Sequence, residues 1–169
     1  GITSNPSLVS LEGLAGLRVV GGDIDVRDNS VLSSLAGLES LDTVEDLIII
    51  GNPLLTQLAT MNRLTQIGGS LTVTTNAALP SLAGLNRVAS VQGFLVISEN
   101  ASLTSLEGLS GLTTVGRFVT IIGNGSLESL QALHQLQTLV GRLTIRDNVL
   151  LPAAEVEAFT AVLSERGYE

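Results

Sequence analysis

Several residue types that carry chemistry are scarce in this chain. Among 169 residues there is no cysteine and no tryptophan, and His134 is the single histidine. The absence of cysteine excludes disulfides, thiolate metal ligands and a cysteine nucleophile. One histidine does not provide a zinc site of the usual nitrogen and sulfur ligands. We therefore expect no metal and no cofactor, and we predict that His134 faces the surface.

Positive charge and long apolar runs are scarce as well. All eight basic residues are arginines, and the net charge is −8. This balance argues against nucleic acid, whose phosphates require dense lysine and arginine. No apolar run approaches the roughly 18 residues that a membrane helix needs, so we predict no membrane span in this sequence. Aromatic residues make up 2% and hydrophobic residues 44%, which favours an interior of stacked aliphatic side chains.

The abundant feature is a repeat marked by asparagine. Successive repeats are 24, 23, 24, 24, 24 and 24 residues long, measured between Asn5, Asn29, Asn52, Asn76, Asn100, Asn124 and Asn148. A fixed period of 20 to 50 residues is typical of a solenoid. Each unit reads N-x-x-L-x-x-L-x-G-L-x-x-L-x-x-V-x-G-x-L-x-I-x-x. Its L-x-I piece alternates as a short strand does, and its leucines three residues apart fit corners or short 3₁₀ turns.

These patterns predict a mainly β fold. We expect a right-handed single-stranded parallel β-helix or leucine-rich-repeat-like solenoid of about seven 24-residue coils over residues 1–151. The repeated asparagines should form a buried ladder that satisfies backbone groups of neighbouring coils. The side chains expected inside are the pairs Leu71/Val73, Leu95/Ile97, Val119/Ile121 and Leu143/Ile145. The 23-residue coil should keep its core, because its deletion falls at the bend before the strand.

Glycine recurs at two positions of the unit, and each indicates a positive φ or a close backbone approach. The first position holds Gly13, Gly37, Gly84 and Gly108, and the second holds Gly22, Gly69, Gly93 and Gly141, with Gly116 one residue early.

After Asn148 the repeat ends and a helix is predicted within residues 152–169, as part of the same domain. Pro152 marks its start and Gly167 its end. An apolar face of Val156, Phe159, Val162 and Leu163 should cover the last coil. The N-terminus shows no matching cap, so we expect the natural protein to continue upstream and the first coil to be open to self-association.

The phrase NASLTSLEGLSGLTTVGRFVTIIGN resembles the receptor L-domain family, whose members are solenoids related to leucine-rich repeats. It is most similar to the regular versions in bacterial surface and secreted proteins. The resemblance covers residues 2 to 151, and the closing DNVLLPAAEVEAFTAVLSERG resembles the helical end of such domains. It implies an adhesive or binding role outside a bacterial cell. The absence of cysteine departs from the receptor versions, whose ends carry disulfides.

Carboxylates are the remaining candidates for chemistry. The second coil carries Glu39, Asp42, Glu45 and Asp46, and the coil before it carries Asp23, Asp25 and Asp28. Paired acids hydrolyse glycosides in some enzymes, and acid clusters bind calcium in others. Neither the EF-hand spacing nor the calcium-binding nonapeptide repeat is present. We interpret these acids as a solvated edge, predict no catalytic residue, and keep calcium binding and a carbohydrate-active β-helix as alternatives.

The outward residues of the predicted strands are the strongest sign of function. Four middle coils present no charge there, and the candidate interaction face comprises Ile48, Ile50, Thr72, Thr74, Val96, Ser98, Thr120 and Ile122. The flanking pairs, Asp25/Arg27 and Thr144/Arg146, carry charge. An uncharged patch with a charged rim often marks an interface, although β-branched residues also simply favour strands. We predict a non-enzymatic extracellular module that binds protein or glycan here, or a structural solenoid that self-associates in an oligomer or filament.

Overall fold

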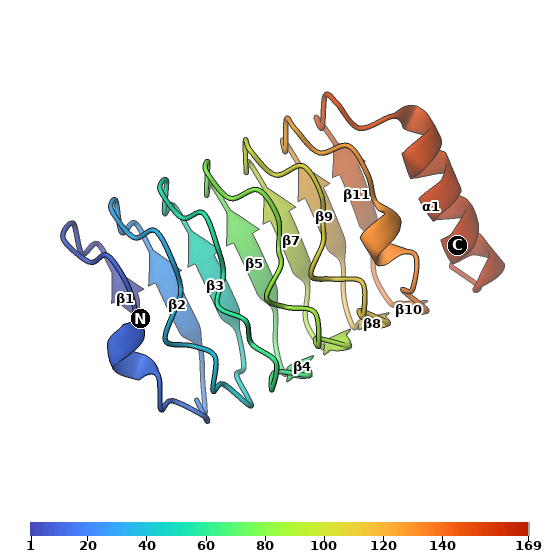
Figure 1. Cartoon of the computed structure of the whole chain (residues 1–169). Helices are drawn as coiled ribbons and strands as arrows, with labels where there is room; N and C mark the ends of the chain where they lie inside the picture. The colour runs from blue at the N-terminus through green and yellow to red at the C-terminus, as the bar shows by residue number, and fades with distance from the viewer. Residues whose placement is uncertain (169) are drawn as a thin grey trace.

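The computed structural model describes residues 1–168 as a parallel β-solenoid that ends in one helix (Figure 1). Its main sheet has seven strands in the order β1-β2-β3-β5-β7-β9-β11, all parallel to their neighbours. The strands are β1 (Ile2–Thr3), β2 (Ile24–Arg27), β3 (Leu47–Ile50), β5 (Leu71–Thr74), β7 (Leu95–Ser98), β9 (Val119–Ile122) and β11 (Leu143–Arg146). The predicted solenoid is confirmed. The seven strands mark the start and end of six complete turns, so the expected count of seven coils was one too high. Residue 169, the last of the predicted cap segment, lies outside the described residues.

A second, narrower parallel sheet lines another side of the solenoid. It has the order β10-β8-β6-β4 and comprises β4 (Gln66–Ile67), β6 (Ser90–Val91), β8 (Thr114–Val115) and β10 (Thr138–Leu139). Sequence reasoning did not predict it, because strands of two residues are too short to leave an alternating pattern. Of the predicted 3₁₀-like corners, two form 3₁₀ helices, η1 (Glu12–Leu14) and η2 (Gln131–Leu133).

Aliphatic side chains from every coil fill the interior. The inward residues of β5, β7 and β9 are completely buried, as predicted, and so are the leucines spaced by three, such as Leu103, Leu106 and Leu109. Leu143 and Ile145 in β11 are only partly buried, which corrects the prediction for the last strand. The last coil has no further coil against it, and the helix covers only part of its open side.

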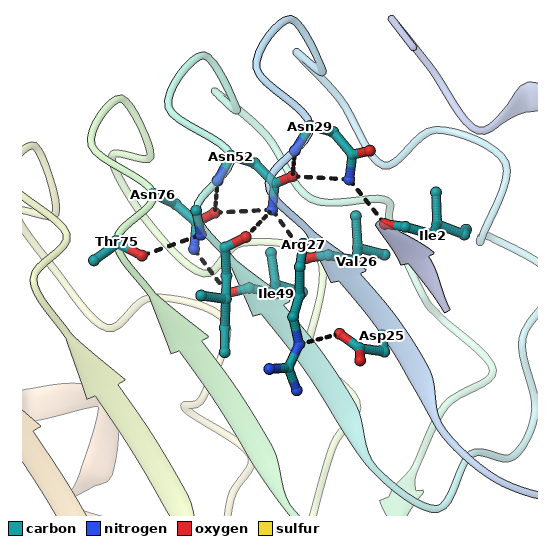
Figure 2. Close-up of polar contacts among 11 residues, drawn as sticks. Ile2, Asp25, Val26, Arg27, Asn29, Ile49, Asn52, Thr75 and Asn76 are labelled. Carbon is teal, nitrogen blue, oxygen red and sulfur yellow. Dashed lines mark hydrogen bonds and ion pairs between the residues drawn. The ribbon is translucent and has the colours of Figure 1, made fainter. Parts of the chain in front are cut away.

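The asparagines form the predicted ladder, and Figure 2 shows its first rungs. Asn52 donates its side-chain N–H groups to the carbonyl of Val26 at 3.1 Å and to Asn76 Oδ1 at 3.2 Å. Its own Oδ1 accepts from the backbone and side-chain nitrogens of Asn29, both at 3.2 Å. Six asparagines are buried in this way, but Asn5 is exposed, because no described coil lies before it. The 23-residue coil keeps its rung and its core, with both Val44 and Leu47 buried.

Each ladder asparagine follows a residue with a positive φ. The φ angles of these residues lie between 55° and 68°, and the residues are Ser4, Asp28, Gly51, Thr75, Glu99, Gly123 and Asp147. Only two of the seven are glycine, although other residue types adopt this region at a cost. The bonds made by the following asparagine hold the chain in this conformation. The positive φ before the asparagine is therefore a constant feature of the repeat, whichever residue type occupies the position.

Glycine at the first recurrent position reflects contact between coils. Gly108 has a φ of 107°, and a Cβ there would lie 1.9 Å from the carbonyl oxygen of Leu82 in the preceding coil. Gly37 and Gly84 are in the same situation. Gly13, at the same position of the first coil, has open space instead. Both expected reasons for glycine thus hold wherever a preceding coil is present.

Helix α1 (Ala153–Glu165) closes the C-terminal end, as predicted. Phe159 and Leu163 are buried against the last coil, whereas Val156 and Val162 are half-buried. The Glu155 carboxylate accepts hydrogen bonds from Ser129 Oγ and from the backbone N–H of Leu130, both at 2.9 Å. Arg166 donates to the carbonyls of two residues in the coil below, His134 and Leu136. No helix in residues 1–168 is long and apolar enough to cross a membrane.

His134 corrects one prediction. Its ring stacks on Phe159 with the centroids 6.0 Å apart, and its Nε2 is buried without a hydrogen-bond partner in the described structure. The residue is therefore half-buried under the helix and does not face solvent as expected.

Candidate interaction face

The strand register places all eight predicted face residues on one side of the main sheet. Ile48 pairs with Thr72, Thr72 with Val96, and Val96 with Thr120. The second row runs in the same way through Ile50, Thr74, Ser98 and Ile122. Figure 1 shows these strands side by side with little offset between coils. Because each pair is in register, the side chains form two straight rows across a nearly flat sheet.

These residues are only partly exposed. All eight are half-buried, whereas the most exposed large apolar side chains lie elsewhere, including Val19 at 67% and Val140 at 73%. Adjacent strands lie about 4.8 Å apart, so neighbouring side chains in a row cover one another. Exposed apolar area therefore does not mark this face. What distinguishes the face is its lack of charge over four strands.

A third row, one residue before each strand, was missed by sequence reasoning. It contains Phe94 and Phe118, whose rings stack with centroids 4.8 Å apart and planes within 2°. The signal was available, because Leu95 and Val119 point inward and the preceding residue must then point outward. The full row is Asp23, Asp46, Ser70, Phe94, Phe118 and Arg142. It therefore runs from acidic at the β2 end, through aromatic, to basic at the β11 end.

Hydrogen bonds fix the acidic part of this row. Asp46 Oδ1 accepts from the backbone N–H of Ser70 at 2.6 Å, and Ser70 Oγ accepts from that of Phe94 at 3.2 Å. In the next row, Thr74 and Ser98 share a hydroxyl hydrogen bond of 3.1 Å. At the β2 end, Arg27 forms an ion pair with Asp25. Asp46, Ser70 and Thr74 thus bind the backbone or a side chain of the next coil, which helps to hold the surface in one conformation.

The second-coil acids have structural partners. Asp42 lies between Arg18 and Arg63 and forms an ion pair with each. Hydrogen bonds from Arg63 and Arg18 lower the pKa of Asp42 below its ordinary value. The Glu39 carboxylate accepts from the backbone N–H of Gly37 at 2.8 Å. A glycosidase general acid requires the opposite shift, a raised pKa. In residues 1–168, no cluster of three or more acidic or histidine residues could hold a metal ion.

Comparison of the chain with protein-family models, with curated proteins and with solved structures gave no match. What the face does must therefore be inferred from its own residues and geometry.

Proposed function

We propose that this chain is a non-enzymatic interaction module that binds a protein or glycan through the outer face of its main sheet. We place it on or outside a bacterial cell, as a receptor-L-like relative of the leucine-rich-repeat solenoids. The family and the location rest on the phrase described above. The binding role rests on the face itself.

One observation carries the proposal. The outward pairs of β3, β5, β7 and β9 hold no charged residue, whereas β2 and β11 carry Asp25, Arg27 and Arg146 in the same rows. The fold therefore accepts charge at these positions, so strand geometry alone does not require the uncharged centre. Two stacked phenyl rings extend that centre by a third row. Uncharged surface with aromatic residues is typical of the core of an interface.

The rigidity of the face supports binding further. Side-chain bonds join its coils, and the buried asparagine ladder fixes the register at the C-terminal ends of its strands. A surface that is already ordered loses little conformational entropy when a ligand binds.

Self-association is the second candidate, and the distribution of charge favours it. The row through Asp46 and Phe94 is acidic at one end and basic at the other. Two copies placed face to face in opposite directions would bring unlike charges together. Seven strands about 4.8 Å apart, each about four residues long, span only about 29 by 13 Å. This is less than half of the roughly 800 Å² that each partner contributes to a standard interface. The area favours a narrow ligand over a second copy.

The test is to place charge in the face without disturbing the core. The double variant Ile50→Arg/Ile122→Arg should melt at nearly the same temperature, because surface substitutions rarely change stability by more than about 0.5 kcal/mol each. Its binding to glycan and protein arrays, and any self-association by ultracentrifugation, should weaken strongly, since a charge buried at an interface without a partner is costly.

Val149→Arg is the matched control, because Val149 is 80% exposed and lies outside the strands. It should leave both melting and binding unchanged. If the double variant folds normally and binds every ligand of the unmodified protein equally well, the rows of the face only reflect strand propensity.

A further inference from the structure

A hollow lies beside the candidate face, at the C-terminal end of the main sheet. It has a volume of about 420 Å³ and lies between the coils that carry β9 and β11, which are neighbours in Figure 1. The side chains that line it are Arg117, Phe118, Thr120, Val140, Arg142 and Thr144. Its volume falls within the range of about 300–1,000 Å³ that is usual for ligand sites.

The two arginines of this hollow have no ionic partner within residues 1–168. Arg18 and Arg63 pair with Asp42, and Arg146 pairs with Asp147. Arg117 and Arg142 form no such pair, although acidic residues outnumber basic ones by 16 to 8. Two exposed guanidinium groups at one hollow of an acidic protein provide a local site for an external anion. Guanidinium binds carboxylate in a planar, two-point geometry.

The groups beside the two arginines indicate which other chemical features the ligand has besides its negative charge. Phe118 is 40% exposed and Val140 is 73% exposed, so they offer an apolar wall. Thr120 and Thr144 add hydroxyl groups that both donate and accept hydrogen bonds. A sugar acid presents the same three features: a carboxylate, an apolar ring face and hydroxyls.

A peptide fits this surface less well. An extended peptide usually joins a sheet at an edge, where backbone N–H and C=O groups are free. Here β9 is paired on both sides, with β7 and with β11. Although β11 is the last strand of the sheet, the hollow lies over the face between β9 and β11, where Thr120 and Thr144 line it, and not at the free edge of β11. A peptide lying across the face would leave its own backbone groups with few partners, whereas a glycan has no backbone amides to satisfy.

We propose that the hollow binds a uronate unit of an acidic polysaccharide, with its carboxylate on Arg117 and Arg142 and its ring against Phe118. This inference rests on the proposed function, because it chooses one of the two ligand classes assigned to the face.

The experiment is calorimetric titration of the whole chain with an oligomer of galacturonic acid. Arg117→Gln and Arg142→Gln should each raise the Kd roughly tenfold, the effect of losing one charge-assisted contact. Arg87→Gln is the matched control. Arg87 is exposed, has no ion pair in the described structure and lies in a turn outside both sheets, so its loss should not change the Kd. The methyl-esterified oligomer, which has no carboxylate charge, should bind far more weakly. Melting curves should be unchanged for all three variants.

Three outcomes would overturn the inference: no binding of the oligomer, equal weakening by Arg87→Gln, or equally tight binding of polyglutamate or a sulfated glycan. The proposed function would still hold after any of these outcomes if the unmodified protein binds another ligand on the arrays and Ile50→Arg/Ile122→Arg no longer binds it. If that double variant changes no interaction at all, the proposed function fails as well.

Discussion

The substitution Asn100→Ala removes one rung from the middle of the ladder. Asn100 is completely buried, and its Nδ2 donates to the carbonyl of Val73 at 3.0 Å. Its Oδ1 accepts from the backbone N–H of Asn76, also at 3.0 Å. Alanine leaves both of these backbone groups without the side-chain partner. Asn124 Oδ1 loses its bond from Asn100 Nδ2 but still accepts from the backbone N–H of residue 100.

The expected cost follows from those two groups. A buried backbone group without a hydrogen-bond partner costs about 1–3 kcal/mol, so the variant should lose about 2–6 kcal/mol of unfolding free energy. This is a large share of the 5–15 kcal/mol that stabilises a typical domain. Urea unfolding followed by circular dichroism measures the loss. Solenoids can unfold in parts, so agreement between two spectroscopic probes should be checked first.

Asn5→Ala is the matched control for this measurement. Asn5 makes bonds of the same kind to Asn29 and Thr3, but it is exposed. Water can replace its contacts, so the loss should stay below about 1 kcal/mol. Equal and small losses at both positions would refute the claim that buried rungs stabilise the stack.

Two further predictions concern coil contact and the cap. Gly108→Ala should destabilise the fold by more than the roughly 1 kcal/mol of an ordinary glycine effect, because its Cβ would overlap the preceding coil, whereas Gly13→Ala has room and should be neutral or slightly stabilising. Equal melting temperatures for the two variants would contradict the coil contact seen at Gly108. At Glu155, hydrogen bonds from the Leu130 N–H and the Ser129 hydroxyl hold the carboxyl pKa below its ordinary value. A lowered folded-state pKa adds stability that is present above the ordinary pKa and is lost as pH falls through the folded value. The stability difference between the unmodified chain and Glu155→Gln should therefore shrink on acidification, and a constant difference between pH 7 and pH 3 would count against this coupling.

Much of this architecture could be predicted from the sequence. The asparagine spacing defined the turns, and the alternation in pairs such as Leu95/Ile97 separated the inside from the outside. The eight residues of the candidate face followed from the same alternation. Because these features recur in every coil, the pattern in one coil supports the assignment of strands and inward residues in the next.

Features without a repeated residue type were not predictable in this way. The residue before each asparagine needs a positive φ, yet Thr75 and Glu99 are poor choices for it. The ladder bonds impose that conformation and override local preference. The burial of His134 depends on where the helix lies, which no local pattern encodes. The stacked rings of Phe94 and Phe118 were missed because they lie one residue before β7 and β9, and only the residues within the strands were considered for the face.

The central claim is that successive coils stack in register, so that the outward residues form one continuous face. The absence of cysteine allows this to be measured directly with two introduced spin labels and pulsed electron resonance. Labels at Ile48→Cys/Thr144→Cys lie four strand spacings apart and should give a narrow distance near 19 Å. Labels at Asp25→Cys/Thr144→Cys lie five spacings apart and should give about 24 Å. An increase of about one strand spacing between the two pairs is the result we predict. Broad distributions, or equal distances for the two pairs, would contradict the stacked solenoid and the face built on it.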